Sequence, residues 1–220
     1  MDFLIFFTFG TFVGSFFNVV IYRMPRDESI IKPRSHCPAC KESIPFYRNI
    51  PLVSFILQAG KCANCQGAIS LQYPAVELIN GLIWGWSFYT LSFPEAVTAS
   101  FLSSILIAIA WIDARIYMVP LDLIIAGVVV LFFAVIFGVL TYSQVLWGIA
   151  AGVLLPGFMM GLTWLVTRRQ GMGFGDLQLG LILGAWVGPI AMILTLFFAS
   201  FLGLVAWIAI SMVKGLDRDR

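Results

Sequence analysis

Long apolar runs recur along the chain, and they limit the folds that it can adopt. Most of these runs approach the roughly 20 residues that an α-helix needs to cross the hydrocarbon core of a bilayer. Of the 220 residues, 60% are hydrophobic and 11% are charged, so a single globular core could not bury the apolar surplus. We therefore expect an all-α polytopic membrane bundle of about seven transmembrane helices, over residues 3–22, 74–92, 96–112, 120–140, 145–167, 176–188 and 190–213.

The distribution of basic residues predicts the orientation of these helices. All 13 Lys and Arg residues fall on one side of a seven-helix arrangement, in the segments 23–61, 115, 168–169 and 214–220. The loops on the opposite side contain none. Because positive charge is retained in the cytoplasm, we expect the N-terminus outside and the C-terminus inside.

One sizeable polar loop, residues 23–73, separates the first expected helix (1–22) from the remaining helical region (74–220). It contains all four cysteines, in two CxxC pairs that 21 residues separate: Cys37, Cys40, Cys62 and Cys65. Two such pairs can close a tetrahedral shell of four thiolates around Zn²⁺. Two disulfides are the alternative, which a reducing cytoplasm disfavours. Since so small a loop has little core, the zinc of this zinc-ribbon-like loop would be structural.

An apolar segment at 49–60 lies between the two cysteine pairs. Asn49 suits the N-cap of a short helix, Pro51 its first turn and Gly60 its end. The segment is too short to span a bilayer. Two interpretations stay open: an interfacial helix that ties the loop to the membrane, or a helix in the core of the loop itself.

Two aspartates carry the chemical argument. Asp113 ends the third expected helix, and Asp176 opens the sixth. The predicted topology puts both at the cytoplasmic boundary, where two carboxyl groups can share one proton. The ionised partner would activate water and the protonated partner would donate to the peptide carbonyl oxygen, as in aspartic proteases.

The glycines before the second aspartate fit the same chemistry. Gly173 and Gly175 would let the backbone approach an extended substrate without side-chain interference. Ordinary roles are the alternatives: Asp113 could pair with Arg115 at the surface, and Asp176 could cap a helix.

Seven short motifs follow one another along the chain: GSFFNVVIYRMP at 14–25, SHCPAC at 35–40, NIP at 49–51, GKCANC at 60–65, YPAVEL at 73–78, an aspartate and a proline separated by six residues at 113–120, and GFGD at 173–176. In this order they resemble the type IV prepilin peptidases, which are bifunctional leader peptidases and N-methyltransferases of bacterial pilus and type II secretion systems. The resemblance covers nearly the whole chain and implies that Asp113 and Asp176 are the catalytic pair.

The reaction that the resemblance implies has two parts. The enzyme would cleave a short basic leader from a prepilin or pseudopilin at the cytoplasmic face of the bacterial inner membrane. It would then methylate the new N-terminal amine with S-adenosylmethionine. The expected partners are these substrates and membrane lipid, with no nucleic acid.

The chain departs from the family pattern at two points. The family often has Leu-Pro-Asp after the first aspartate, whereas Pro120 is followed here by Leu121 and Asp122. We therefore expect Asp122 to open a helix. The family is also commonly drawn with eight helices, whereas we expect seven.

No glycine-rich nucleotide-binding fingerprint marks a site for S-adenosylmethionine. A cofactor pocket would have to be built from the polar loop and the cytoplasmic helix ends. Four polar residues in that zone are candidates: Asn18, Arg23, Lys61 and Glu77. The two cations would serve equally as topology anchors.

Three other functions remain as alternatives. One is a peptidase without methyltransferase activity. A membrane scaffold with a zinc-bound docking loop would explain the helices and the cysteines but not the GFGD motif. A proton-coupled transporter would place its acids near the bilayer midplane, whereas here we expect them at one boundary.

Overall fold

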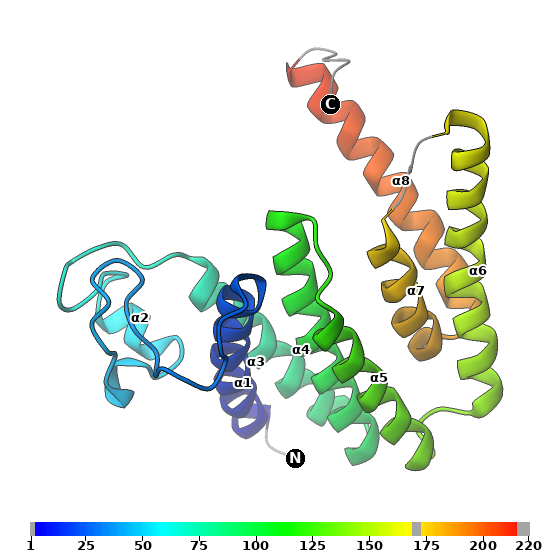
Figure 1. Ribbon diagram of the computed structural model, residues 1–220. Coiled ribbons are helices and arrows are strands. Elements are labelled where there is room, and N and C mark those ends of the chain that lie inside the picture. The colour runs from blue at the N-terminus through cyan, green and yellow to red at the C-terminus, as the bar shows by residue number, and fades with distance from the viewer. Residues whose placement is uncertain (1–2, 169–172, 215–220) are drawn as a thin grey trace. The chain divides into compact units, whose positions relative to one another are not determined.

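The computed structural model describes residues 3–168 and 173–214 (Figure 1). Within these ranges the elements are helical, and only two isolated bridges occur, between His36 and Ser43 and between Lys61 and Ala68. The predicted all-α class is confirmed. The chain forms two compact units, Met1–Val139 and Leu140–Arg220. Three of the basic residues used to predict the topology lie outside the described residues: Arg169, Arg218 and Arg220.

Seven long helices in the described part of the chain coincide with the expected ones: α1 (Phe3–Arg23), α3 (Gln72–Thr90), α4 (Phe93–Ile116), α5 (Leu121–Ile136), α6 (Tyr142–Thr167), α7 (Phe174–Val187) and α8 (Pro189–Lys214). Four apolar stretches are long enough to cross a bilayer: Phe3–Arg26, Phe93–Ile116, Tyr142–Thr167 and Pro189–Ala209. The helices α5 and α7 are shorter and also apolar. The count of seven crossings and the orientation stay predictions.

Helices α1 and α3 make the closest contact of the first unit. A Cβ added to Gly14 of α1 would lie 2.8 Å from the Cα of Glu77, and Gly10 is equally confined. Gly81 and Gly85 of α3 have atoms of α1 within 2.8 Å of an added Cβ. Small residues four apart let helices approach closely in lipid. This contact brings the two ends of the polar loop together, because the loop begins at the end of α1 and finishes at the start of α3.

Helix α4 packs against α1 and α3 and ends in the motif that carries Asp113. It begins with a capping box, in which Ser92 and Glu95 satisfy each other's backbone and side-chain groups. Between α3 and α4 the Trp84 Nε1–H donates to the Ser104 hydroxyl at 3.0 Å. The helix stops at Tyr117, which adopts a left-handed backbone conformation (φ 54°).

Helix α5 is shorter than predicted, because it ends at Ile136 rather than at residue 140. Gly138 takes a positive φ of 71°. The Gly138 N–H then donates to the Val135 carbonyl, and the Val139 N–H donates to the Ala134 carbonyl. This is the Schellman arrangement, which terminates helices at glycine. The expectation that Asp122 opens this helix is confirmed, since it lies in the first turn.

The helix predicted at 49–60 is also shorter, and its predicted cap is wrong. The segment forms α2 (Val53–Leu57), which Leu52 precedes with a φ of 61°, while Asn49 ends a separate 3₁₀ turn, η2 (Phe46–Arg48). The Ser54 hydroxyl, not Asn49, accepts a backbone hydrogen bond here, from the Ile50 N–H at 2.9 Å. A further 3₁₀ turn, η1 (Met24–Arg26), follows α1.

The second unit depends on an unusually close contact between α6 and α7. A Cβ on Gly152 would lie 1.9 Å from the backbone oxygen of Gly180, and one on Gly148 would lie 1.9 Å from that of Gly184. The backbones therefore touch with no side chain between them. Since α7 carries Asp176 in its first turn, this contact fixes the aspartate relative to α6.

We expect Gly152→Ala to destabilise the second unit. The added methyl group would meet backbone, so α6 and α7 must separate, at a cost of about 1–3 kcal/mol or more. The matched control is Gly161→Ala in the same helix, where an added Cβ has no neighbour within 4 Å. Thermal unfolding in detergent measures both variants, and equal melting temperatures would contradict the packing described here.

Candidate functional site

The four cysteines converge in the polar loop. Their Sγ atoms all lie within 4.8 Å of one another, and those of Cys37 and Cys65 are 3.9 Å apart. All four are free thiols, which agrees with the metal interpretation and not with two disulfides. In a tetrahedral shell with Zn–S bonds of about 2.3 Å, sulfurs are separated by roughly 3.8 Å. The cluster can therefore hold a metal ion of this kind.

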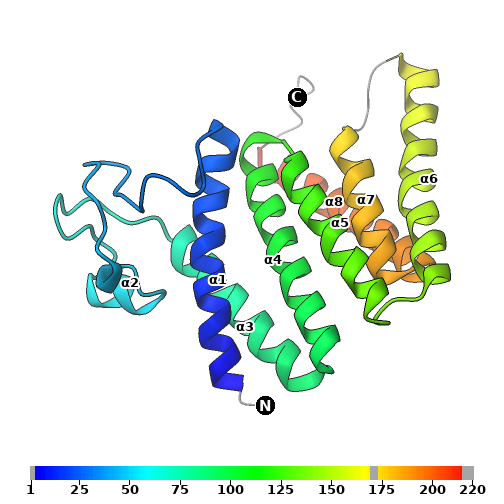
Figure 2. The ribbon, with the colours of Figure 1, turned by 60° about the horizontal axis from the view of Figure 1, so that its bottom comes forward.

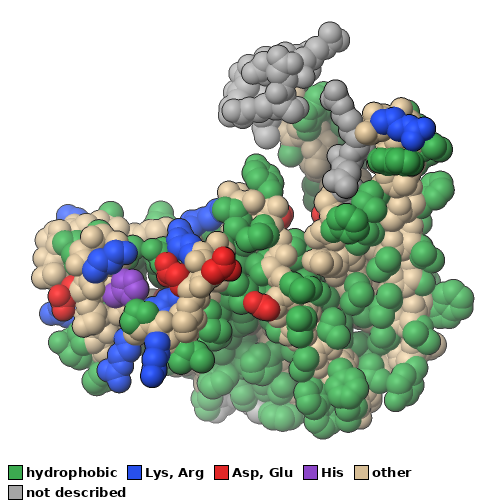
Figure 3. Space-filling model, viewed as in Figure 1, with side chains coloured by type: hydrophobic (Ala, Val, Ile, Leu, Met, Phe, Trp, Pro, Cys, Tyr) green, Lys and Arg blue, Asp and Glu red, His purple; other side chains and the backbone are tan. Residues whose placement is uncertain are grey.

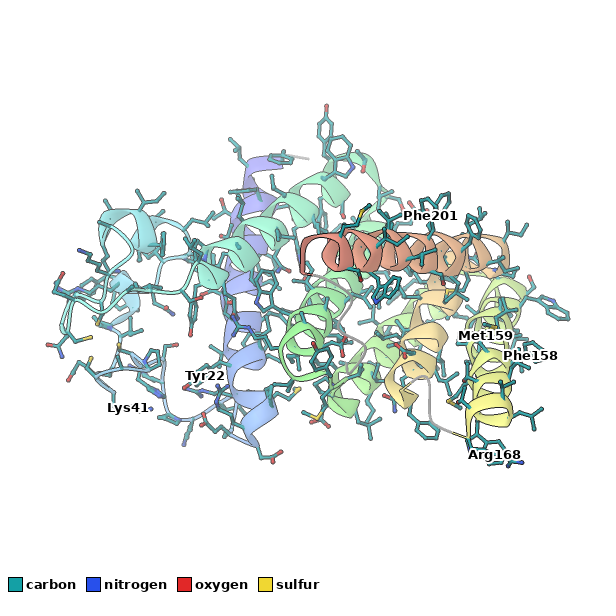
Figure 4. The ribbon with its side chains drawn as sticks, turned by 90° about the horizontal axis from the view of Figure 1, so that it is seen from above. Tyr22, Lys41, Phe158, Met159, Arg168 and Phe201 are labelled. Atoms are coloured by element: carbon teal, nitrogen blue, oxygen red, sulfur yellow. The ribbon has the colours of Figure 1, made fainter. Side chains whose placement is uncertain are left out.

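The two halves of the cluster are copies of one backbone unit. In each, the first cysteine's carbonyl accepts from the residue four positions later, at 2.9 Å: from Lys41 for Cys37 and from Gln66 for Cys62. Those two donors both adopt positive φ, 59° and 58°. Two turns of the same geometry thus present two sulfurs each; Lys41 projects from the first (Figure 4).

The surroundings of the second turn shift the pKa values of its two thiols in opposite directions. Hydrogen bonds from the backbone N–H groups of Cys65 and Asn64 lower the pKa of Cys62 to about 6. The Gly67 N–H lowers the pKa of Cys65, but desolvation and the neighbouring thiols outweigh it and raise the pKa to about 11. Four thiols so close cannot all ionise alone, whereas a bound cation would stabilise all four thiolates.

A cavity of about 390 Å³ lies between this loop and the ends of three helices of the first unit. Its walls include Tyr22 at the end of α1, Tyr73 and Glu77 at the start of α3, and Arg115 at the end of α4. Both cysteine turns contribute to the opposite wall. The volume is within the range of small-molecule sites. Figure 4 shows Tyr22 beside the loop.

Three of the four predicted cofactor residues line this cavity. Asn18 is 1% exposed; its amide donates to the Tyr73 carbonyl at 3.0 Å and its oxygen accepts from Gln72 at 3.4 Å. Arg23 is 4% exposed, and its guanidinium donates to the carbonyls of Ser29 and Arg34. Lys61 precedes Cys62 and is not among the residues that line the cavity.

Glu77, the third of these residues, joins the loop to the helices. Its Oε2 accepts from the Leu52 N–H at 2.8 Å, across 25 positions of sequence. This bond pulls the segment before α2 against the flank of α3. Sequence reasoning did not place Arg115 or the aromatic residues in a cavity wall, because nothing in their local sequence separates a cavity lining from a helix end.

The predicted catalytic aspartates both lie at helix ends. Asp113 is in the last turn of α4, in the first unit, and is partly buried. Asp176 is in the first turn of α7, in the second unit, and is exposed. Gly173 precedes α7 in an extended conformation, and a Cβ placed there would lie 3.9 Å from the Asp176 Oδ2. Gly175 lies within the first turn.

Comparison with known proteins gives consistent matches. Residues 8–91 match the bacterial peptidase A24 N-terminal domain, and residues 100–208 match the type IV leader peptidase family. A prepilin leader peptidase/N-methyltransferase of Myxococcus xanthus is 36% identical over 95% of this chain and 63% of its own length. One from Neisseria gonorrhoeae is 35% identical over 94% of this chain and 81% of its own.

A third relative, from Escherichia coli, is named a type 4 prepilin-like proteins leader peptide-processing enzyme. It is 33% identical over 89% of this chain and 81% of its own length. The chain thus spans somewhat less than two thirds of the M. xanthus protein and about four fifths of the other two. No solved structure matches it.

The fold and the site define a polytopic helical membrane protein with a four-cysteine cluster in the loop after its first helix. Helix-end aspartates lie in each of its two units. Together with the matches, these features show that the chain belongs to the type IV leader peptidase family, as its motifs indicated.

Metal analysis of the purified protein tests the cysteine cluster. We expect Cys62→Ser to lose most of the bound metal, because three thiolates leave the shell open. Asn64→Ala should retain metal but bind it roughly 10–100-fold more weakly, since Asn64 Nδ2 donates to the Cys40 sulfur at 3.7 Å. Mass spectrometry of metal content and competition with a chelator measure the two effects. Unchanged metal in Cys62→Ser would refute the site.

Proposed function

We propose that the chain cleaves the leader of prepilins or pseudopilins with Asp113 and Asp176 as an aspartyl pair. Family membership carries this proposal, because the relatives are named as leader peptidases. The positions of the two aspartates, each within one turn of a helix end, support it further. One carboxylate would deprotonate water while the other, protonated, donates to the scissile carbonyl. Gly173 and Gly175 would leave room for the extended substrate backbone.

The site is proposed to face the cytoplasm across the bacterial inner membrane, where a basic leader would lie. The basic residues of the loop and of the helix ends support this orientation. In the view of Figure 3, most of the charged side chains lie over the polar loop, and hydrophobic side chains cover the helices. Water for hydrolysis would enter from this boundary. The transmembrane helices 74–220 would form the peptidase core and residues 23–73 the methyltransferase region.

Zinc is the metal proposed for the cysteine cluster, in a structural role. The donors are four thiolates, which zinc accepts with no open position for a substrate. The loop around them has few buried apolar side chains, among them Cys37 itself. Metal binding would therefore supply much of its folding free energy.

We infer that S-adenosylmethionine binds in the cavity between the loop and α1, α3 and α4. The Arg23 guanidinium would pair with its carboxylate and Glu77 would face its cationic groups, with Asn18 as a further polar contact. The aromatic rings of Tyr22 and Tyr73 in the wall could hold the sulfonium by cation–π attraction. Lys61 remains a candidate through its position beside Cys62.

Asparagine substitutions test the aspartyl pair. We expect Asp113→Asn and Asp176→Asn each to lower the rate of prepilin cleavage in liposomes by about 10²–10⁴-fold. Asp122→Asn, an acid at the neighbouring helix start, is the matched control and should cleave normally. All three should keep their metal. Full-rate cleavage by either of the first two variants would remove that residue from the mechanism.

Substitution of Arg23, the buried basic residue of the cavity, tests the cofactor site. We expect Arg23→Lys to raise the KM for S-adenosylmethionine about tenfold or more, since a charged hydrogen bond contributes roughly 1.5–3 kcal/mol. Leader cleavage should continue. The control is Arg168→Lys, because Arg168 stacks on the Trp164 ring at 4.9 Å and does not line the cavity. Equal KM values in the two variants would place the cofactor elsewhere.

A further inference from the structure

The segment Phe46 to Gln58, which contains η2 and α2, has one apolar face that nothing in the described chain covers. The exposed fractions are 86% for Phe46, 48% for Val53, 74% for Ile56 and 80% for Leu57. The last three are spaced i, i+3, i+4, so they lie on one side of α2. A helix in the core of the loop would bury these side chains, so their exposure favours the interfacial interpretation of the segment.

The opposite face of the same segment lines the cavity. Leu52, Ser54, Phe55 and Gln58 all contribute to its wall. The segment is therefore a thin partition, with the candidate cofactor site on one side and its exposed apolar face on the other. Whatever covers the outer face also supports that wall.

The position of this segment along the transmembrane helices identifies what covers it. The Leu52 N–H donates to Glu77, five residues into α3 and about 8 Å from its start at 1.5 Å per residue. Glu77 in turn packs against Gly14, nine residues and roughly 14 Å before the end of α1. Figure 2 shows α2 beside α1, well below the end that leads into the loop. The segment thus lies along the flank of α1, a helix long and apolar enough to cross a bilayer.

The neighbouring surface has the same character. A groove beside the segment is lined by Phe46 and Ile50 of the loop and by Phe12 and Phe16 of α1, and both α1 side chains are about half exposed. The apolar face of the loop is thus continuous with the lipid-facing side of α1. Residues 43–76 contain no Asp or Glu, and Arg48 and Lys61 are their charged residues, which suits anionic headgroups.

We propose that residues 46–57 are seated in the lipid leaflet at the Arg23 end of α1, with Val53, Ile56 and Leu57 in contact with acyl chains. The occupant of the exposed face is the bilayer itself. The Tyr47 ring and Arg48, which lie 5.7 Å apart, would mark the headgroup level, as aromatic and basic residues do at membrane interfaces. A consequence, which rests on the proposed function, is that lipid holds one wall of the cofactor cavity in place.

Depth-dependent quenching tests this placement without reference to activity. A small fluorescent amino acid is introduced at position 57 or at position 28, an exposed site just beyond α1, and the full chain is placed in nanodiscs. The label at 57 should be quenched strongly by lipids that carry a quencher on the acyl chain, since interfacial segments lie ~5–10 Å below the headgroup boundary. The label at 28 should respond mainly to aqueous iodide. Normal metal content shows that each labelled protein is folded.

Two outcomes would overturn the proposal. If iodide quenches both labels equally, the segment is in water. If neither quencher reaches position 57, a protein surface covers it instead of lipid.

A charged substitution tests the consequence for the cavity. Leu57→Asp should weaken S-adenosylmethionine binding several-fold in nanodiscs and leave leader cleavage intact, whereas Glu28→Gln should change neither. If acyl-chain quenchers strongly quench the label at position 57 but Leu57→Asp leaves the cofactor affinity unchanged, the segment lies in lipid and its proposed link to the cavity is refuted. If even the unsubstituted protein fails to bind the cofactor, the proposed cofactor site falls while the quenching result stands.

Discussion

The backbone contact between α1 and α3 is the constraint on which the first unit depends. At Gly14 the backbones of the two helices touch, and Gly10, Gly81 and Gly85 make room for side chains of the other helix. The helices therefore lie close enough for the polar loop to start and finish at neighbouring points. The loop can then fold with almost no core of its own. The four clustered cysteines hold together the two turns of the loop that contain them. The hydrogen bond from the Leu52 N–H to Glu77 attaches the segment between these turns to α3.

The two cysteine turns have the same backbone structure although their sequences differ at most positions. Residues 35–44 and 60–69 share only their two cysteines and the final isoleucine. They nevertheless make the same backbone hydrogen bonds and take the same positive φ one residue after the second cysteine. The geometry is set by the turn and by the convergence of four sulfurs, and the remaining positions are free to line the cavity.

Helix α4 connects the two proposed reactions. Its last turn carries Asp113, the proposed peptidase acid, and Arg115 two residues later lines the cavity proposed for the methyl donor. A substrate held near the end of this helix would lie beside one residue of each proposed site. In the proposed scheme the polar loop adds a second chemistry to a helical core without adding a second domain of ordinary size.

The sequence by itself determined the helical class, the positions of seven apolar helices, the four cysteines that cluster and the family, because periodicity, composition and motif order are local properties. It misjudged the end of α5, where Gly138 closes a Schellman turn, and the start of α2, where Leu52 takes a positive φ. It proposed Asn18, Arg23 and Glu77, which line the cavity, but it could not identify the rest of the wall. Arg115, Tyr22 and Leu52 come from segments far apart in sequence, and only the glycine contact of α1 with α3, which folds the loop back along their flank, brings them together.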